Sequence, residues 1–182
     1  MKGLARASLR FSRGVVSPRL VCEAGFVQTY QDQNIQGNSL DLRVRDVFEA
    51  QGELILGKDF RTLPQYHLLS PQQDDSGEWY LLYPNRRYQV EFIERVSLPG
   101  YLCGVTMVRS TMAKSGCSGE SGLFDSGYEG STGMMITVAS SARIQRGARV
   151  AQMVFHRAHS HQLYSGFYQS SVSPHHWKRE EK

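Results

Sequence analysis

Residues 87–116 read RYQVEFIERVSLPGYLCGVTMVRSTMAKSG, and the fold class is clearest in this stretch. Two runs rich in β-branched and aromatic residues, Arg87–Ile93 and Leu102–Val108, stand on either side of a break that contains Pro99 and Gly100. Such runs favour strands, whereas proline and glycine favour turns. The stretch therefore predicts two β-strands joined by a short connection.

Short runs of the same kind continue on both sides of this stretch, separated by Gly, Pro, Asn, Asp and Ser. The further strands that the pattern predicts are Leu40–Val47, Glu53–Leu56, Trp79–Tyr83, Met134–Val138 and Arg149–His156. Many short strands with regular turns are typical of a sandwich, a jelly roll or a barrel. We therefore predict an all-β domain, preceded by residues 1–37 that are irregular or partly helical.

The composition is that of one folded domain. The chain has 182 residues, of which 21% are charged and 40% hydrophobic, and this argues against global disorder. Its formal net charge of +4 suits a polyanionic ligand, although a mild excess also serves solubility alone. No apolar run approaches the roughly 18 residues that a membrane span needs. The three cysteines, Cys22, Cys103 and Cys117, include no CxxC pair, and their odd number fits a reducing, cytoplasmic location.

The two ends of the chain differ in composition from its middle. Residues 1–34 form a basic segment expected to belong to the same domain, residues 35–170 hold the strand pattern, and residues 171–182 form a polar tail. The basic residues that precede the first acid, Glu23, are Lys2, Arg6, Arg10, Arg13 and Arg19. This start fits a short helix with a basic face or a transit peptide.

Two polar stretches interrupt the strand pattern. Residues 71–78 (PQQDDSGE) indicate a hairpin tip or loop. Residues Ser115 to Gly133 are rich in Gly and Ser and predict a loop that is mobile or shaped around a ligand.

Residues 109–116 (RSTMAKSG) carry groups that bind phosphate. Arg109 and Lys114 can neutralise phosphate charge, and the hydroxyls of Ser110 and Thr111 can donate to phosphate oxygens. Taken alone, such a basic strand end is also typical of a solvated turn.

Residues 122–130 (GLFDSGYEG) place a carboxylate and an aromatic ring three residues apart around a glycine turn. Asp125 can orient and deprotonate a water, and the ring of Tyr128 can pack against a sugar or a base. Taken alone, Asp-Ser-Gly is an ordinary turn.

Two further segments resemble strands that carry polar side chains. Residues 146–155 (RGARVAQMVF) lead from a glycine turn into a strand on which Gln152 offers a neutral donor and acceptor. In residues 38–44 (NSLDLRV), Asp41 and Arg43 alternate with apolar residues and so share one sheet face. Taken alone, these two charges predict a structural ion pair at the surface.

In order and spacing, the four segments together resemble the motifs of the trimeric dUTPases and dCTP deaminases. The resemblance covers roughly residues 35–170, and VEFIERVSLPGYLCG at 90–104 resembles the strand, turn and strand before the second motif. The ending LYSGFYQSS at 163–171 resembles the Tyr-x-Gly-x-Tyr-Gln ending of archaeal-type dUTPases and deaminases. The branch that this ending implies is the deaminase-like one, in which some members are dUTPases.

This resemblance implies a distorted jelly roll or β-barrel that assembles as a homotrimer, with active sites between subunits. It also implies hydrolysis of dUTP to dUMP and pyrophosphate, with Mg²⁺ held mostly by the triphosphate and water. By this analogy Asp125 activates the attacking water, Tyr128 packs under the deoxyribose, and Asp41 supports the water shell of the metal. The residues expected to hold the rest of the substrate are Arg109, Ser110, Thr111, Lys114, Gln152, Tyr168 and Gln169. A membrane or a nucleic acid is not an expected partner.

One departure separates this chain from the deaminases of the family, which carry a glutamate ten residues after the Asp of the third motif. That position is Met135 here, and a thioether cannot shuttle the proton that attack at the pyrimidine C4 requires. Glu129 is expected in the turn rather than on the Met134–Val138 strand. The sequence therefore predicts dUTP hydrolysis without dCTP deamination. Lys114 in place of the usual arginine, and the Gly- and Ser-rich loop, leave the choice of base open.

Alternative functions remain. His156, His159 and His161 form an H-x-x-H-x-H pattern that fits either a solvated strand end or a metal site. The signature of the zinc-dependent deaminases, H-x-E with P-C-x-x-C, is absent from the sequence. The fold also suits a nucleotide sensor or partner-binding protein, and an enzyme that acts on another or a modified deoxynucleotide, including dCTP.

Overall fold

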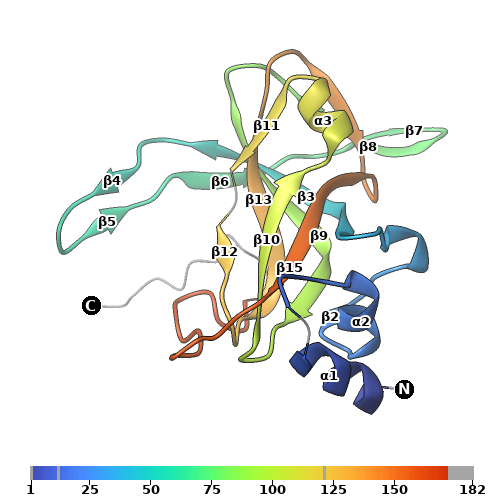
Figure 1. Cartoon of the computed structure of the whole chain (residues 1–182). Helices are drawn as coiled ribbons and strands as arrows, with labels where there is room; N and C mark the ends of the chain where they lie inside the picture. The colour runs from blue at the N-terminus through green and yellow to red at the C-terminus, as the bar shows by residue number, and fades with distance from the viewer. Residues whose placement is uncertain (1, 12, 121, 172–182) are drawn as a thin grey trace.

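The computed structural model describes residues 2–11, 13–120 and 122–171 (Figure 1). Its helices are α1 (Lys2–Phe11), α2 (Pro18–Glu23), the 3-10 helix η1 (Asp32–Asn34) and α3 (Ser110–Lys114). Its longer strands are β3 (Leu40–Gln51), β8 (Gly77–Leu82), β9 (Arg87–Ser97), β10 (Leu102–Val108), β13 (Glu129–Val138) and β15 (Arg149–Arg157). The shorter strands are β1 (Val15–Val16), β2 (Val27–Gln28), β4 (Ile55–Leu56), β5 (Arg61–Thr62), β6 (Gln65–Leu68), β7 (Gln72–Asp74), β11 (Cys117–Glu120), β12 (Leu123–Phe124) and β14 (Ala142–Gln145). Of the expected polar tail, only Ser171 lies within the described residues.

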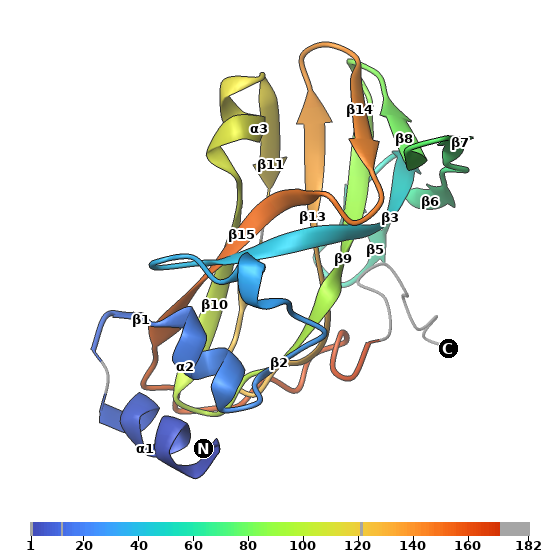
Figure 2. The ribbon, with the colours of Figure 1, turned by 90° about the vertical axis from the view of Figure 1, so that its right-hand side faces the viewer.

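Antiparallel pairing joins most of the strands into one curved sheet. Its order is β11-β13-β9-β3-β15-β10-β12, with β1 added to β15, β2 to β9 and β6 to β3. Figures 1 and 2 show this sheet curling around the core, with α1 and α2 near one end and the smaller β14-β8-β7 sheet near the other. Each predicted strand overlaps an observed one, and the predicted all-β class is confirmed.

One face of each long strand points to the core. Along β10, Leu102, Gly104 and Thr106 are buried, while the side chains between them are half-exposed. This alternation follows from the two-residue period of a strand. Large, fully buried side chains come from α1 and from several strands: Leu9, Tyr80, Tyr88, Phe92, Phe155, Leu40, Leu42, Leu82 and Leu102. Each such side chain contributes about 1.5–3 kcal/mol when it leaves water, and together they stabilise the curved sheet.

The basic N-terminal segment packs on the body of the same domain. Helix α1 buries Ala5 and Leu9, and its Arg6 donates to the carbonyl of Ala24 at 3.1 Å while its guanidinium lies 5.1 Å from the centre of the Phe26 ring. Strand β1 pairs with β15, and β2 pairs with β9. The structure therefore agrees with the expectation of a short helix that has a basic face.

The expectation of a loop from Ser115 to Gly133 is wrong. This stretch holds β11, β12 and the start of β13, because its small residues pair with strands that are distant in sequence. A Cβ at Gly119 would lie 2.5 Å from Cγ1 of the branched Val108 side chain, so the close packing there favours glycine. The other polar stretch, residues 71–78, does contain a hairpin turn, between β7 and β8.

Arg43 does not form the ion pair expected with Asp41. Its Nε lies 2.6 Å from Glu94 Oε1, and its backbone N–H donates to Glu94 Oε2 at 2.8 Å. The Glu94 side chain has no exposed surface, and 12% of the Arg43 side chain is exposed. Asp41 pairs with other arginines. Glu94 thus links β9 to β3 by a buried ion pair. Removal of either partner from such a pair destabilises the fold.

We predict that Glu94→Ala lowers the free energy of unfolding by about 3–5 kcal/mol, because Arg43 keeps its charge in a buried place without its carboxylate. Glu49→Ala is the matched control, since Glu49 pairs with an arginine, Arg86, whose side chain is half-exposed. The control loses at most about 1 kcal/mol. Urea unfolding of both variants measures the difference, and equal losses would contradict the assignment.

Candidate active site

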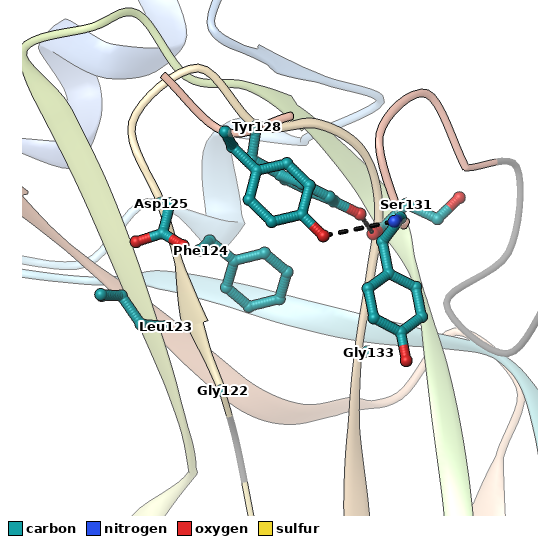
Figure 3. A pocket seen from close by; sticks show the side chains of 9 residues that line it. Gly122, Leu123, Phe124, Asp125, Tyr128, Ser131 and Gly133 are labelled. Atoms are coloured by element: carbon teal, nitrogen blue, oxygen red, sulfur yellow. Dashed lines mark hydrogen bonds between the residues drawn. The ribbon is translucent and has the colours of Figure 1, made fainter. Parts of the chain in front are cut away.

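An aromatic pocket of about 210 Å³ opens beside the turn between β12 and β13 (Figure 3). It is lined by Gly122, Leu123, Phe124, Asp125, Tyr128, Ser131, Gly133, Tyr164 and Tyr168. Two backbone hydrogen bonds to Leu98 hold the turn. The N–H of Gly127 donates to the carbonyl of Leu98 at 3.0 Å, and the N–H of Leu98 donates to the carbonyl of Tyr128 at 2.8 Å. The Leu-Pro connection after β9 thus positions the third motif.

Tyr128 forms one wall of this pocket. The centre of its ring lies 5.4 Å from that of Phe124 and 5.5 Å from that of Tyr164, both at edge-on angles. Its hydroxyl donates to the backbone carbonyl of Ser131 at 2.6 Å (Figure 3). Burial raises the pKa of Tyr128 to about 12, so the hydroxyl stays protonated at neutral pH. The result is a rigid apolar wall that suits a sugar or a flat ring.

Asp125 lies at the edge of the pocket rather than inside it. Figure 3 shows its carboxylate oxygens on the side away from the Tyr128 ring. Asp125 also borders a second cavity of about 400 Å³, formed with residues 160–166. Burial, and then the negative charge of Asp125, raise the pKa of the Cys103 thiol. Cys103, on β10, therefore lies near the Asp125 carboxylate, and its thiol stays uncharged.

The segment after β15 closes one side of the pocket. The N–H of Tyr164 donates to the carbonyl of Ser126 at 2.8 Å. The amide of Gln169 donates to the carbonyl of Gly127 at 3.0 Å and accepts from the N–H of Glu129 at 3.2 Å. The structure thus brings the predicted residues Tyr168 and Gln169 to the Asp125 turn, and Gln169 holds that turn in place.

A second polar group, the arginine cluster, consists of Asp41, Arg109 and Arg149. Arg109 Nε lies 3.2 Å from Asp41 Oδ1, and Arg149 Nη1 lies 3.3 Å from Asp41 Oδ2. The Asp41 side chain is 1% exposed, whereas 29% of Arg109 and 39% of Arg149 face solvent. Burial raises the pKa of Asp41, and the two arginines oppose this. Two guanidiniums on one carboxylate leave a net positive charge at the surface.

The remaining predicted phosphate-binding residues lie beside the arginine cluster. Gln152 is the register partner of Asp41 on one side and of Met107 on the other, and it accepts from the Ser39 hydroxyl at 3.4 Å. Helix α3 follows Arg109 directly and carries the predicted residues Ser110, Thr111 and Lys114, all of which are exposed. Sequence reasoning missed Arg149, although it lies within the strand motif that contains Gln152. It also missed Phe124 and Tyr164, the aromatic residues of the third and last motifs.

Within one chain, the arginine cluster and the Asp125 pocket lie at opposite ends of β10. Phe124, next to Asp125, pairs with Gly104, whereas Arg109 follows the last residue of the strand. Five residues of strand separate the two levels by about 16 Å. The two groups therefore lie at separate levels of the sheet of one chain.

Met135 lies on the central part of β13, with Glu120 of β11 and Gln89 of β9 as its register partners. Register partners share a sheet face, so a carboxylate does stand next to the thioether. Glu129 was expected in the turn, but it is the first residue of β13. Neither acid occupies position 135 itself.

The described residues contain no group of three His, Cys, Asp or Glu side chains that could hold a metal ion. The histidine pattern at the end of β15 therefore gains no support as a metal site. The three cysteines, all in the described part of the chain, are free thiols. None of the helices in residues 2–171 that the structure describes is long and apolar enough to cross a membrane.

Comparison with known proteins agrees with this geometry. Residues 18–158 match the family model described as dCTP deaminase-like. A protein of Methanosarcina acetivorans named probable deoxyuridine 5′-triphosphate nucleotidohydrolase is 31% identical over 160 residues, which cover 85% of this chain and 89% of the relative. A protein of the same name from Halobacterium salinarum is 29% identical over 147 residues, 80% of this chain and 89% of the relative.

Among solved structures, a 2′-deoxycytidine 5′-triphosphate deaminase from Agrobacterium tumefaciens has a similar fold, with a TM-score of 0.63 and 18% identity. The match covers 81% of this chain and 49% of that one. The fold, the four motifs and the family match define a nucleotide-binding jelly-roll class. The chain belongs to the dCTP deaminase-like family.

Proposed function

We propose that this chain is a dUTP diphosphatase, an enzyme that hydrolyses dUTP to dUMP and pyrophosphate with Mg²⁺. The observation that carries the proposal is a carboxylate, Asp125, at the edge of an aromatic pocket walled by Tyr128. Relatives about 30% identical over most of their length are named for this activity. Met135, at the position where the deaminases of the family carry a glutamate, favours dUTP hydrolysis over deamination.

We also propose that the active site is completed between copies in a homotrimer. The reason is the separation of about 16 Å along β10 between Asp125 and the arginine cluster of the same chain. An arginine cluster from a neighbouring copy could lie closer to Asp125. The surface between the two groups, here called the outer sheet face, is apolar. Its apolar residues are Val15, Val105, Met107, Leu123 and Val154 on β1, β10, β12 and β15, and Gln152 and His156 share the same face. A neighbouring copy seated on this face would bring its arginine cluster to Asp125.

The proposed reaction needs one proton acceptor and a concentration of positive charge. Asp125 takes a proton from a water as the water oxygen attacks the α-phosphorus. The bond from that phosphorus to the bridging oxygen breaks, and pyrophosphate leaves. Arg109 and Arg149 neutralise charge that builds on the phosphate oxygens, because guanidiniums match their geometry.

The other predicted residues have supporting roles in this proposal. Tyr128 packs against the deoxyribose and leaves no room for a 2′-hydroxyl, and Tyr168 closes the pocket beside it. The groups that donate to the triphosphate are Ser110, Thr111, Lys114 and Gln152. Gln169 holds the Asp125 turn rather than the substrate.

The residues present fit a magnesium ion that arrives with its nucleotide. Mg²⁺ keeps several waters and binds substrate phosphates with few protein ligands, so it needs no protein cage. When bound, it neutralises charge on the triphosphate. Asp41 is the carboxylate nearest to Arg109 and Arg149, and both of its oxygens already accept from them. Asp41 would therefore influence the water shell of the metal through the arginines.

The first prediction concerns the products. Incubation with dUTP and Mg²⁺ releases pyrophosphate and dUMP, whereas dCTP releases no ammonia, because Met135 cannot carry a proton to the ring. Separate assays for pyrophosphate and ammonia, run over all common dNTPs and NTPs, measure both reactions. Ammonia from dCTP that disappears in Glu120→Gln would instead assign deamination to the acid beside Met135. Nucleotide binding without any product would make the protein a sensor.

A second prediction tests the base. Asp125→Asn keeps the shape of the side chain but cannot accept a proton, so kcat falls by at least about 100-fold while KM changes little. Asp75→Asn, an exposed change at the β7–β8 turn, is the control and keeps wild-type rates. Retention of more than roughly a tenth of the rate in Asp125→Asn would show that another group is the base.

A third prediction tests whether the site is shared between copies. Asp125→Asn and Arg109→Ala chains are each inactive alone, but coexpression restores pyrophosphate release to roughly a quarter of the wild-type rate, because some interfaces combine the intact halves. Asp125→Asn coexpressed with Asp125→Ala is the control. Both chains lack the same base, so no interface is intact and no activity returns. Failure of the first pair to recover would place the whole site in one chain.

A further inference from the structure

Three titratable side chains from three neighbouring strands form a row across the sheet, at the level of the Asp125 turn. Cys103 of β10 is the register partner of His156 of β15. On the other side of β10, Phe124 of β12 pairs with Gly104, so the next residue, Asp125, continues this line opposite Cys103. The order in the row is therefore Asp125, Cys103, His156, with the cysteine in the middle.

The three side chains of this row belong to the outer sheet face. Figure 3 shows the Asp125 carboxylate turned away from the ring of Tyr128. Burial first, and then the negative charge of Asp125, raise the pKa of the Cys103 thiol, as expected of near neighbours. Cys103 and His156 are both half-buried, whereas Phe155, the residue before His156, points into the core. A carboxylate and an imidazole thus lie on one face with only a thiol between them.

The spacing of the row fits an in-line displacement at phosphorus. Neighbouring strands lie about 4.8 Å apart, so Asp125 and His156, on either side of β10, start from backbone positions about 10 Å apart. In an in-line transfer the attacking and leaving oxygens lie about 4 Å apart, and a hydrogen bond of about 2.8 Å to each brings the base and the acid to roughly 9–10 Å. Cys103 has a short side chain, so a phosphoryl group above it can contact both ends of the row.

The groups around His156 leave its imidazole free to exchange a proton with a phosphate. On the β10 side lie the Cys103 thiol, which stays uncharged, and beyond it Asp125. On the other side, β1 places the apolar Val15 opposite His156. Arg157, the next residue of β15, is engaged elsewhere, because its guanidinium donates to a backbone carbonyl before β10 at 3.0 Å and lies over an aromatic ring. Histidine is the side chain that most readily gains and loses a proton near neutral pH.

We propose that His156 is the general acid that protonates the leaving pyrophosphate. This inference rests on the proposed function, in which Asp125 takes a proton from the attacking water. As the bond from the α-phosphorus to the bridging oxygen breaks, that oxygen keeps the electron pair and accepts the proton of the His156 imidazolium. The proton of the water ends on Asp125, and exchange with solvent restores both groups. The α-phosphoryl group lies above Cys103 during the transfer.

The first test is the dependence of kcat on pH, with dUTP and Mg²⁺. In the wild-type chain kcat falls at alkaline pH, because a deprotonated imidazole has no proton to donate. His156→Gln keeps a polar side chain but removes the acid, so kcat falls about 100-fold at pH 7, KM changes little, and the alkaline loss disappears. His67→Gln, an exposed change on β6, is the matched control and keeps the wild-type rate and pH profile.

The second test separates proton transfer from a structural role of the imidazole. The bisphosphonate that leaves from β,γ-difluoromethylene dUTP is less basic than the one that leaves from β,γ-methylene dUTP, so it depends less on a proton donor. The ratio of the wild-type rate to the His156→Gln rate is therefore smaller for the difluoromethylene substrate. Equal ratios for the two substrates would mean that His156 donates no proton to the leaving group, and would overturn the proposal.

A third measurement tests contact with the phosphates apart from turnover. The nitrogen bridge of α,β-imido-dUTP resists hydrolysis, so this analogue stays bound while the imidazole NMR signals of the full chain are recorded against pH. The signal that is missing in His156→Gln identifies this residue. In the wild-type chain the analogue keeps His156 protonated to a higher pH than in the free chain, because the phosphate charge favours the imidazolium.

The outcomes separate the acid role from the proposed function. A normal wild-type rate of which His156→Gln retains more than roughly a tenth would refute the acid role alone. An imidazole signal of His156 that ignores the bound analogue would refute it as well. A wild-type chain that releases no pyrophosphate from dUTP would refute the proposed function, and the acid role with it. Circular dichroism and Tm of His156→Gln stay at wild-type values, so a loss of rate is not a loss of fold.

Discussion

The double pairing of β3 is the constraint on which the rest of the structure depends. The first residues of this strand pair with β15, and its later residues pair with β9, so β3 joins the two halves of the sheet. The ladder shifts register between Val44 and Asp46, and such an irregularity bends a strand. The buried ion pair between Arg43 and Glu94 stabilises this bend. Because the sheet curls at β3, strands from both ends of the chain enclose one core.

Strand β3 also determines where the arginine cluster lies. β3 carries Asp41 to a buried place next to β15, where the carboxylate pairs with Arg109 and Arg149. Burial of the Asp41 carboxylate without a partner would cost free energy. Its two guanidinium partners more than neutralise its charge. The surface next to α3 therefore keeps a fixed excess of positive charge. In the proposed function, this preorganised group binds phosphate without first losing side-chain freedom.

The distance along β10 is the observation behind the proposed sharing of the site between copies. The strand holds the backbone levels of the Asp125 pocket and of the arginine cluster about 16 Å apart. The most exposed side chains between them, Met107 and Leu123, are apolar. In the proposed function, a neighbouring copy covers this surface and completes the active site.

The sequence by itself determined the all-β class and the longer strands, because two-residue alternation is a local signal, and the resemblance of its four motifs to a family gave the candidate residues Asp125, Tyr128 and Arg109. Only the tertiary structure decided that Ser115–Gly133 forms strands, since small residues acquire that state from long-range pairing and not from their own preference. It also decided that Arg43 pairs with Glu94, and that Arg149, Phe124 and Tyr164 belong to the site. Those partners are set by sheet register, which brings together residues far apart in the chain, and no local pattern encodes it.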